Sequence, residues 1–218
     1  KLRGNANLNA HSVPFNMEAD SLNSSILGNS VEPGDPEFNL FIKEIRKEMT
    51  VKCGQKCTAV RRIFVPERLI DAVQDALIAS LTKATKGDPN LEGVRMGAMV
   101  NVGQKEEVER QVKILETEAD CVYRDLSEPL GDVNDAAFMG PVLLRMNETD
   151  NAQHCHDVEA FGPVSTLMPY RDIEHAIALV NRGKGSLCCS LVSHNVHEAR
   201  RFVLGAAVMH GRILVLDR

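Results

Sequence analysis

The sequence lacks a long apolar run. No stretch of its 218 residues approaches the roughly 20 apolar residues that a membrane span needs, and the start, Lys1-Leu2-Arg3, lacks the apolar core of a secretory signal. Positive charge is not in excess either, because 25 Lys and Arg stand against 30 Asp and Glu, for a formal net charge of −5. This balance offers no general attraction for nucleic acid or anionic membrane surfaces, and we expect neither as a partner.

Paired metal-ligand motifs are also missing. The six cysteines occupy positions 53, 57, 121, 155, 188 and 189, and no two form a C-x2-C pair. His154-Cys155-His156 is rich in ligand types, but adjacent side chains tend to point in different directions, so we expect no bound metal. Cys188-Cys189, in an apolar run, is unlike a disulfide framework. Reduced thiols in a cytoplasmic protein are the better interpretation.

What the sequence does contain is an alternation of helical and strand patterns. With 44% hydrophobic and 25% charged residues, it has the composition of a globular protein with one well-buried core. Apolar spacing predicts helices over 38–49 (ending near Gly54), 67–86, 103–119, 172–182 and 196–209. Strands are predicted over 13–17, 61–65, 120–124, 137–146, 187–193 and 212–216, with 21–37 mostly loop. This order predicts an α/β fold with a largely parallel sheet flanked by helices.

Cys57 is the first candidate for chemistry. The run Gly54-Gln55-Lys56-Cys57-Thr58-Ala59 places a thiol in a loop after a helix, beside small residues that leave room for a substrate. A cysteine nucleophile reacts as the thiolate, which nearby positive charge favours. The neighbouring basic residues are Lys52, Lys56, Arg61 and Arg62. Taken alone, a buried structural cysteine is the more common alternative.

Two carboxylates complete the candidate chemistry. Glu18 follows the predicted strand over 13–17, and a carboxylate beside an apolar strand can act as the general base that activates water. Glu159 opens the run Glu159-Ala160-Phe161-Gly162-Pro163, in which the Gly-Pro turn would present Glu159 and Phe161 on one rigid edge. For Glu18 taken alone, a solvated turn residue is the more common alternative. For Glu159 and Phe161 the alternative is a simple loop with a core Phe, and residue chemistry alone does not decide between the two interpretations of this segment.

Taken in order, these segments resemble the aldehyde dehydrogenase superfamily. Gly54-Gln55-Lys56-Cys57 matches its Gly-Gln-x-Cys nucleophile motif, and residues 159–163 match its Glu-x-Phe-Gly-Pro motif. Gly87-Asp88-Pro89, followed by Met96-Gly97, is similar to the stretch after the helix that follows the nucleophile. The resemblance covers essentially the whole chain and implies that residues 1–218 form the catalytic domain.

The resemblance also implies a mechanism. Cys57 would add to an aldehyde carbonyl and carry a thioester, while Glu159 and Phe161 would contact the nicotinamide ribose and ring of NADP or NAD. Glu18 would then activate the water that releases the acid. The choice between NAD and NADP stays open, because the family makes it mostly outside this domain.

The general-base region departs from the usual pattern of the family. Most members have Glu-Leu-Gly-Gly, whereas this sequence has Glu18-Ala19-Asp20-Ser21. The run 14–23 is instead similar to one subgroup, the dehydrogenase domain of the bifunctional ring-opening protein of phenylacetate degradation. The semialdehyde dehydrogenase of the benzoyl-CoA box pathway looks alike here too. Both imply a CoA-linked semialdehyde, formed by aromatic ring cleavage, as the substrate.

The family's Rossmann-type cofactor domain and the C-terminal segment that completes its oligomer have no counterpart in the sequence. We therefore expect a fragment of a larger, cytoplasmic, homo-oligomeric enzyme, with little turnover by the fragment alone. Three alternatives remain: a CoA-acylating dehydrogenase with the same cysteine, a non-catalytic thiol- or metal-binding domain, and a structural or interaction domain.

Overall fold

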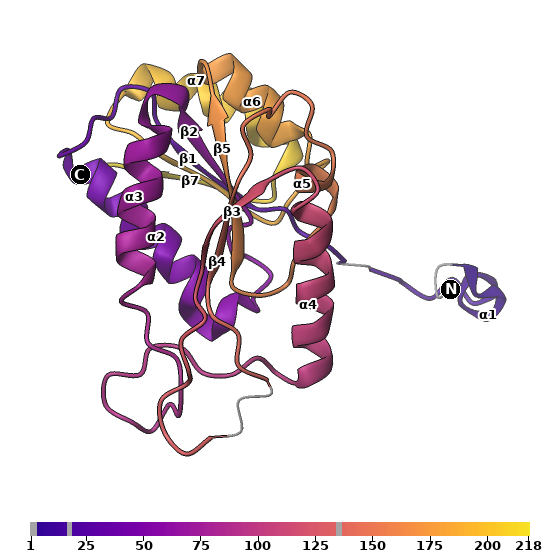
Figure 1. Cartoon of the computed structure of the whole chain (residues 1–218). Coiled ribbons are helices and arrows are strands. Elements are labelled where there is room, and N and C mark those ends of the chain that lie inside the picture. The colour runs from indigo at the N-terminus through magenta and orange to yellow at the C-terminus, as the bar shows by residue number, and fades with distance from the viewer. Residues whose placement is uncertain (1–3, 17–18, 134–136) are drawn as a thin grey trace.

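A single seven-stranded sheet forms the centre of the computed structural model, which describes residues 4–16, 19–133 and 137–218 (Figure 1). The strand order is β3-β4-β5-β2-β1-β6-β7, and every neighbouring pair is parallel except β3 with β4. The strands are β1 (Ser24–Leu27), β2 (Arg62–Pro66), β3 (Asp120–Arg124), β4 (Val142–Arg145), β5 (Val164–Tyr170), β6 (Cys189–Val192) and β7 (Ile213–Leu216). The predicted α/β fold with a largely parallel sheet is confirmed.

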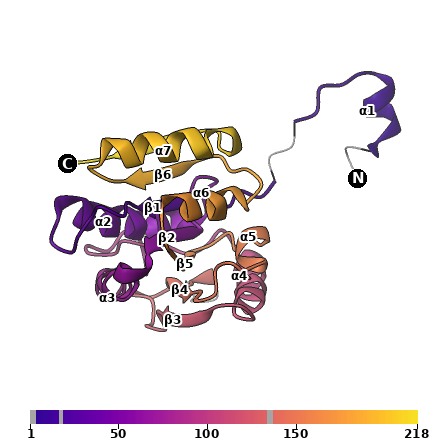
Figure 2. The same ribbon diagram turned by 90° about the horizontal axis from the view of Figure 1, so that it is seen from above.

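Helices cover both faces of this sheet, as the view from above shows (Figure 2). The core on one face packs α2 (Pro36–Thr50) and α3 (Ile70–Leu81) against the strands. The core on the other face contains residues of α4 (Val102–Leu115), α5 (His154–Asp157), α6 (Ile173–Asn181) and α7 (Val196–Ala206). Within the described residues, no helix is both long and apolar enough to cross a membrane.

The central strands supply both cores because successive side chains point to opposite faces. Ile63 and Val65 of β2 join the core under α2 and α3, whereas Phe64 between them joins the other core. All three are fully buried. A strand buried on both faces has no polar side, so its sequence is a short continuous apolar run rather than an alternation.

Two of these buried strands were not predicted. β1 lies inside the segment 21–37 that was expected to be mostly loop, and β5 was not predicted at all. In the sheet, β1 pairs with β2 and β6, and β5 pairs with β2 and β4. Their hydrogen-bonding partners lie far away in the sequence, so local patterns identify them poorly.

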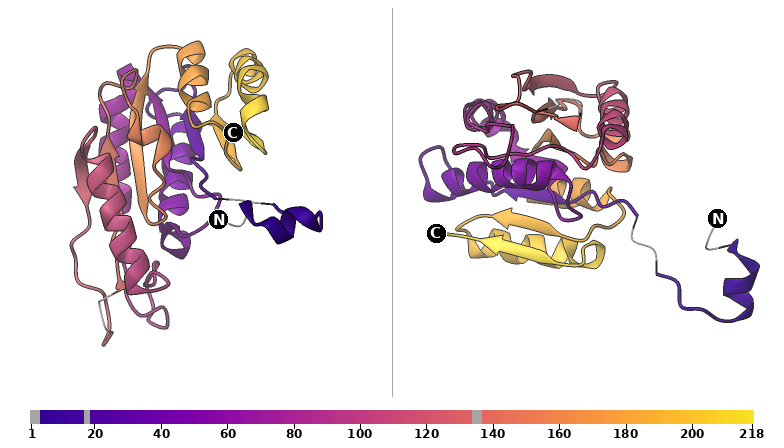
Figure 3. Two further views of the ribbon diagram at one scale, coloured as in Figure 1. Left: turned by 90° about the vertical axis from the view of Figure 1, so that its right-hand side faces the viewer. Right: turned by 90° about the horizontal axis from the view of Figure 1, so that it is seen from below.

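The N-terminal region also differs from the prediction. Residues 13–16 form no strand, and Met17, the last residue of the predicted strand, lies outside the described residues. A short helix that was not predicted, α1 (Ala6–Ala10), has no buried residue and stands apart from the sheet (Figure 3). Helices form in all five regions where they were predicted, although α3 is shorter than the predicted 67–86.

Candidate functional site

The candidate residues that the structure describes lie at one edge of the sheet. Cys57 precedes β2 and Glu159 precedes β5, and these two strands are parallel neighbours. Both motifs therefore lie at the edge where the parallel strands begin, called the amino edge below. Ligands of open α/β sheets more often bind at the opposite, carboxyl edge, so the strand pattern alone would not have indicated this location.

A tight turn connects α2 to Cys57. Lys52 and Cys53 have positive φ angles of 54° and 53°, a conformation that costs side-chain-bearing residues on the order of 1–3 kcal/mol each. Gly54 follows with a φ of 66°, and a Cβ on it would lie 2.1 Å from the carbonyl oxygen of Gly162. The nucleophile motif therefore touches the Glu159 motif, and only glycine fits at the contact.

Exposure separates Cys57 from most of the other thiols. Cys57 and Cys121 are exposed, Cys188 is half-buried, and the remaining three cysteines are buried. Burial raises the pKa of these buried thiols to about 12, which keeps them protonated and unreactive; they are Cys53, Cys155 and Cys189. Cys53, which directly precedes the nucleophile motif, donates to the carbonyl of Met139 at 3.6 Å. This is the contact of a core cysteine.

Asn23 holds the nucleophile loop from the neighbouring strand. Its side chain is fully buried, and its Nδ2 donates to the carbonyls of Cys57 (2.8 Å) and Ala59 (2.9 Å). Its Oδ1 accepts the Cys188 N–H (3.1 Å) and the Ser21 hydroxyl (2.8 Å). All four hydrogen bonds of the amide stay within the protein, so the loop position is well defined. Sequence reasoning missed Asn23 because it lies in the segment predicted as loop.

The basic residues near Cys57 are mostly bound to other protein groups. Lys56 pairs with Glu48 at 2.7 Å, and both side chains are only 20% exposed. Arg61 and Arg62 are buried, and their guanidinium groups bind protein acceptors. Little of the predicted basic surrounding is therefore free positive charge beside the thiol.

Glu159 is bound within the protein by two groups. Its Oε1 accepts from Arg61 Nε at 3.1 Å, and its Oε2 accepts the backbone N–H of Ser21 at 2.8 Å. The carboxylate is only 4% exposed, so a cofactor would meet the remaining lone pairs of a carboxylate that is already positioned. Phe161 is half-buried, and its ring centre lies 5.3 Å from Arg61 Cζ. Glu18, the predicted general base, lies outside the described residues, three positions before Ser21.

The histidine-rich segment has a structural environment. In α5, Cys155 and His156 are buried, and His156 Nδ1 lies 2.9 Å from Arg62 Nη1. Burial, together with the charge of Arg62, lowers the pKa of His156 to about 3, so the ring is a neutral acceptor for the guanidinium. In the described ranges, three metal-ligating groups come together only at Asp35, Glu37 and His194, a group that includes neither Cys57 nor the histidine-rich segment.

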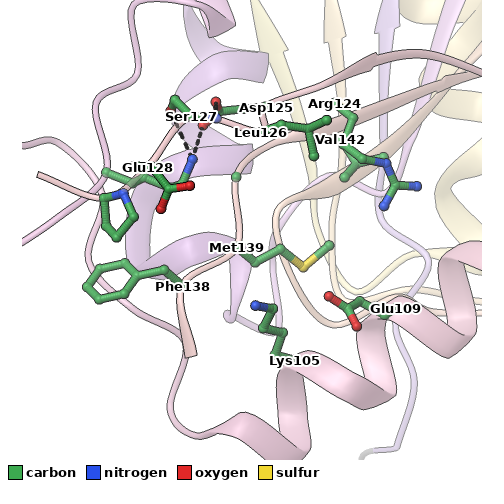
Figure 4. Close-up of a pocket in the computed structure, with 13 residues that line it drawn as sticks. Lys105, Glu109, Arg124, Asp125, Leu126, Ser127, Glu128, Phe138, Met139 and Val142 are labelled. Carbon is green, nitrogen blue, oxygen red and sulfur yellow. Dashed lines mark hydrogen bonds and ion pairs between the residues drawn. The ribbon is translucent and has the colours of Figure 1, made fainter. Parts of the chain in front are cut away.

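A cavity of about 190 Å³ opens beside α4 at the same edge (Figure 4). Lys86 Nζ closes one side, with bonds to Asp125 (2.8 Å) and the hydroxyl of Ser127 (2.9 Å). Met139, whose carbonyl accepts from Cys53, lines the cavity and connects it to the nucleophile loop. Three cationic and three acidic side chains lie in its wall, which gives no preference for a ligand of one charge: Lys86, Lys105, Arg124, Glu109, Asp125 and Glu128.

Comparisons with known proteins agree with this architecture. The family model described as "Aldehyde dehydrogenase family" matches residues 11–213. A 3,4-dehydroadipyl-CoA semialdehyde dehydrogenase from Aromatoleum evansii is 42% identical over the whole chain, which covers 43% of that relative. Protein MaoC from Klebsiella aerogenes is 45% identical over 123 residues, covering 56% of the chain and 36% of that protein. The chain thus spans less than half the length of these relatives.

Solved structures show the same fold. A betaine aldehyde dehydrogenase from Staphylococcus aureus superposes with a TM-score of 0.80 at 22% identity, covering 92% of this chain and 38% of its own. A glyceraldehyde-3-phosphate dehydrogenase from Methanocaldococcus jannaschii, complexed with NADP, gives a TM-score of 0.75 at 21% identity, covering 92% of this chain and 40% of its own. At these identities the likeness concerns the fold alone.

Proposed function

Since the chain belongs to the aldehyde dehydrogenase family, we propose that it carries the nucleophile of an enzyme that oxidises a CoA-linked semialdehyde to the acid. One observation supports this above the others. The exposed thiol of Cys57 lies on a loop that touches the Glu159 motif at the amino edge of the sheet. A thiol that must meet both an aldehyde and a nicotinamide needs this proximity.

In the proposed reaction, the Cys57 thiolate adds to the aldehyde carbon. The carbonyl oxygen becomes an oxyanion, which backbone N–H groups of the loop stabilise. A nicotinamide held at this edge would accept the hydride from the former aldehyde carbon, and Cys57 would then carry a thioester. Glu18 takes a proton from the water that attacks this thioester, and the acid is released.

The described residues fit a nicotinamide cofactor at the same edge. Phe161 is half-buried beside Glu159 and offers an apolar ring face. Each carboxylate oxygen of Glu159 accepts one hydrogen bond from the protein and has capacity for another, which suits ribose hydroxyls. Similar structures have been solved in complex with NAD+ and with NADP, so we propose a nicotinamide dinucleotide of either kind for this site.

The relatives inform the choice of substrate. One relative that matches the whole chain is named for a 3,4-dehydroadipyl-CoA semialdehyde. We therefore place a semialdehyde carried on coenzyme A, derived from aromatic ring cleavage, ahead of simple aldehydes. Phenylacetate and benzoate degradation both generate this class. Comparing kcat/KM for the ring-opened semialdehydes of the two pathways would decide between them.

The test of the nucleophile uses the chain's own cysteines. With limiting iodoacetamide followed by mass-spectrometric mapping, Cys57 should be alkylated first. Cys121 is the matched control, because it is also exposed but lies on β3. Alkylation of Cys121 at the same rate as Cys57 would contradict the assignment. Stoichiometric zinc in the purified protein would instead favour the non-catalytic, metal-binding alternative.

The part of the reaction assigned to this chain is also testable. The described strands form one sheet, and we assign residues 1–218 to the catalytic domain alone. The chain by itself should then react at Cys57 but show little reduction of NADP+ with a simple aldehyde. Turnover comparable to that of a full-length homologue would contradict this assignment.

A further inference from the structure

One buried side chain connects the two motifs of the site. Arg61 Nη2 donates to the carbonyl of Gly54 at 2.9 Å, and Nη1 donates to the carbonyl of Gly162 at 2.7 Å. The third donor, Nε, binds Glu159 Oε1 at 3.1 Å. The guanidinium carbon also lies over the ring of Phe161. Every nitrogen of the group is thus bound to the nucleophile motif or to the Glu159 motif.

These contacts bridge the place where the two loops meet. Gly54 approaches Gly162 so closely that a Cβ would overlap the Gly162 carbonyl. Arg61 binds the carbonyl oxygens on both sides of that contact, so its planar fork fixes their separation. The side chains of Arg61 and Glu159 are each 4% exposed, and a buried ion pair with additional hydrogen bonds holds its geometry far better than a surface pair.

We propose that Arg61 is a positioning residue, which sets the nucleophile loop and the Glu159–Phe161 loop relative to each other. The inference rests on the proposed function, in which Cys57 attacks the aldehyde and Glu159 and Phe161 contact the cofactor. Arg61 itself touches neither substrate nor cofactor. Because it binds both loops, its loss changes the reactivity of Cys57 and the affinity for the nicotinamide together, whereas loss of a purely structural residue changes neither in the folded molecule.

Lysine cannot replace this function. An ammonium group is a single point of charge, whereas the acceptors on Gly54, Gly162 and Glu159 lie on three sides of the guanidinium. Arg61→Lys therefore keeps the positive charge near Glu159 but gives up the bonds that span the two loops.

The neighbouring arginine is a matched control. Arg62 is equally buried, yet its guanidinium binds Leu22, Leu179, Val180 and His156, none of which belongs to either motif. Arg62→Lys removes the same number of side-chain nitrogens from a site of the same kind. Its effect reports what a buried guanidinium contributes to folding alone.

The experiment compares the two lysine variants in the full-length enzyme, because residues 1–218 alone are expected to show little turnover. The first readout is the rate at which iodoacetamide alkylates Cys57, measured across pH. The second is kcat and KM for the nicotinamide dinucleotide. Both are normalised to the folded fraction. Arg61→Lys should slow Cys57 alkylation and raise the nicotinamide KM, each by about tenfold, the effect of one or two lost charge-assisted bonds. Arg62→Lys should lower the melting temperature and leave both quantities within about twofold.

A second variant covers the case in which Arg61→Lys does not fold. Glu159→Gln keeps the shape of the side chain but weakens its bond to Arg61. Glu159 is not bonded to Cys57, but it reaches the nucleophile loop through Arg61 and also through Ser21 and Asn23. The oxygen of the Gln side chain can still accept the Ser21 N–H, so a several-fold slower alkylation of Cys57 in Glu159→Gln reports the connection through Arg61. An unchanged alkylation rate in Glu159→Gln, or equal effects of Arg61→Lys and Arg62→Lys, would overturn the inference.

The same measurements separate failure of the inference from failure of the proposed function. If Cys57→Ser abolishes turnover while Arg61→Lys behaves like Arg62→Lys, Cys57 is the nucleophile and the positioning role is wrong. If Cys57→Ser retains turnover, the proposed function itself is wrong.

Discussion

Two neighbouring arginines at the start of β2 illustrate two different uses of a buried guanidinium. Arg61 and Arg62 are 5% and 1% exposed, and alternation along the strand directs them to opposite faces. Arg61 binds two loop carbonyls and the carboxylate of Glu159. Among the described residues no carboxylate pairs with Arg62, which binds Leu22, His156 and the last turn of α6.

The difference lies in what each arginine holds. Carbonyls at the end of a helix carry partial negative charge, so α6 stabilises the cation of Arg62 without a counter-ion. Burial still lowers the pKa of Arg62, to about 10, and the group remains charged at neutral pH. That network ties together parts of the core. The Arg61 network instead ties together two loops that carry the candidate reactive groups, so equal burial does not mean equal function.

The largest expected effect tests whether the reactive thiol lies near Arg61 or near Arg62. Cys57→Ser should lower turnover of the intact enzyme by at least about a thousandfold, because a hydroxyl is a far weaker nucleophile than a thiolate. Cys155→Ser, on the buried side near Arg62, should leave kcat of the folded protein within about twofold. Steady-state kinetics on both variants make the comparison. Equal losses would mean that exposure does not distinguish the two thiols.

The next effect concerns stability on the Arg62 side. Arg62→Met removes the guanidinium donor from Leu22, His156 and the carbonyls of Leu179 and Val180, which keep only their backbone N–H bonds, and we expect a loss of about 3 kcal/mol in the free energy of unfolding. Urea unfolding followed by circular dichroism measures it. Arg171→Met is the control, because Arg171 forms an exposed ion pair, which solvent screens, and its loss should cost far less stability. Similar losses in the two variants would show that the Arg62 network adds little.

The contact between the two loops on the Arg61 side gives a smaller effect. Gly54→Ala should reduce stability by about 2 kcal/mol, since the residue has a positive φ and its Cβ would overlap the Gly162 carbonyl. Gly34→Ala also has a positive φ, but nothing lies within 4 Å of its Cβ, so only the backbone strain of about 1 kcal/mol is expected. Cys57 alkylation should slow in the first variant alone. Slowing in both would point to a general loosening.

A further effect is the response to acid, which we assign to the Arg62 side. Burial lowers the pKa of His156 to about 3 in the folded state, below the ordinary value of 6.5. The unfolded chain therefore binds more protons between these values, and stability falls as the pH drops from 6.5 toward 3. His210, with a pKa lowered to about 4 by burial, contributes in the same direction.

Replacing His156 isolates its contribution to the pH dependence of stability. His156→Asn should flatten the dependence of the urea midpoint on pH between 6.5 and 4, whereas replacing the exposed His197 by Asn should not. If the urea midpoint depends on pH equally in both variants, His156 does not contribute to the response to acid.

The sequence predicted the fold class and most of the outer elements because their patterns are local. Amphipathic spacing located α2, α4, α6 and α7. It missed β1 and β5, because Ser24-Ser25-Ile26-Leu27 and Val164-Ser165-Thr166-Leu167 are buried without a polar alternation. Parallel neighbours from distant parts of the chain complete their hydrogen bonding, and no window of adjacent residues contains that information.

For the site, the sequence indicated the two motifs but not the residues that hold them in position. Cys57, Glu159 and Phe161 stand in recognisable runs, whereas Asn23 was assigned to a loop and Arg61 to the start of a strand. Both act through bonds to residues that are distant in sequence, from Asn23 to Cys57 and from Arg61 to Glu159. Spacing along the chain does not reveal such contacts.

The sequence by itself determined which residues could react and that helices and strands alternate, because residue chemistry and periodicity are properties of short segments. The tertiary structure decided which thiols are accessible, since burial depends on packing from every part of the chain. It also decided that the two motifs meet, because parallel pairing of β2 with β5 brings their starting ends to one edge. Arg61 lies at that meeting point, and only the folded chain shows what its guanidinium holds.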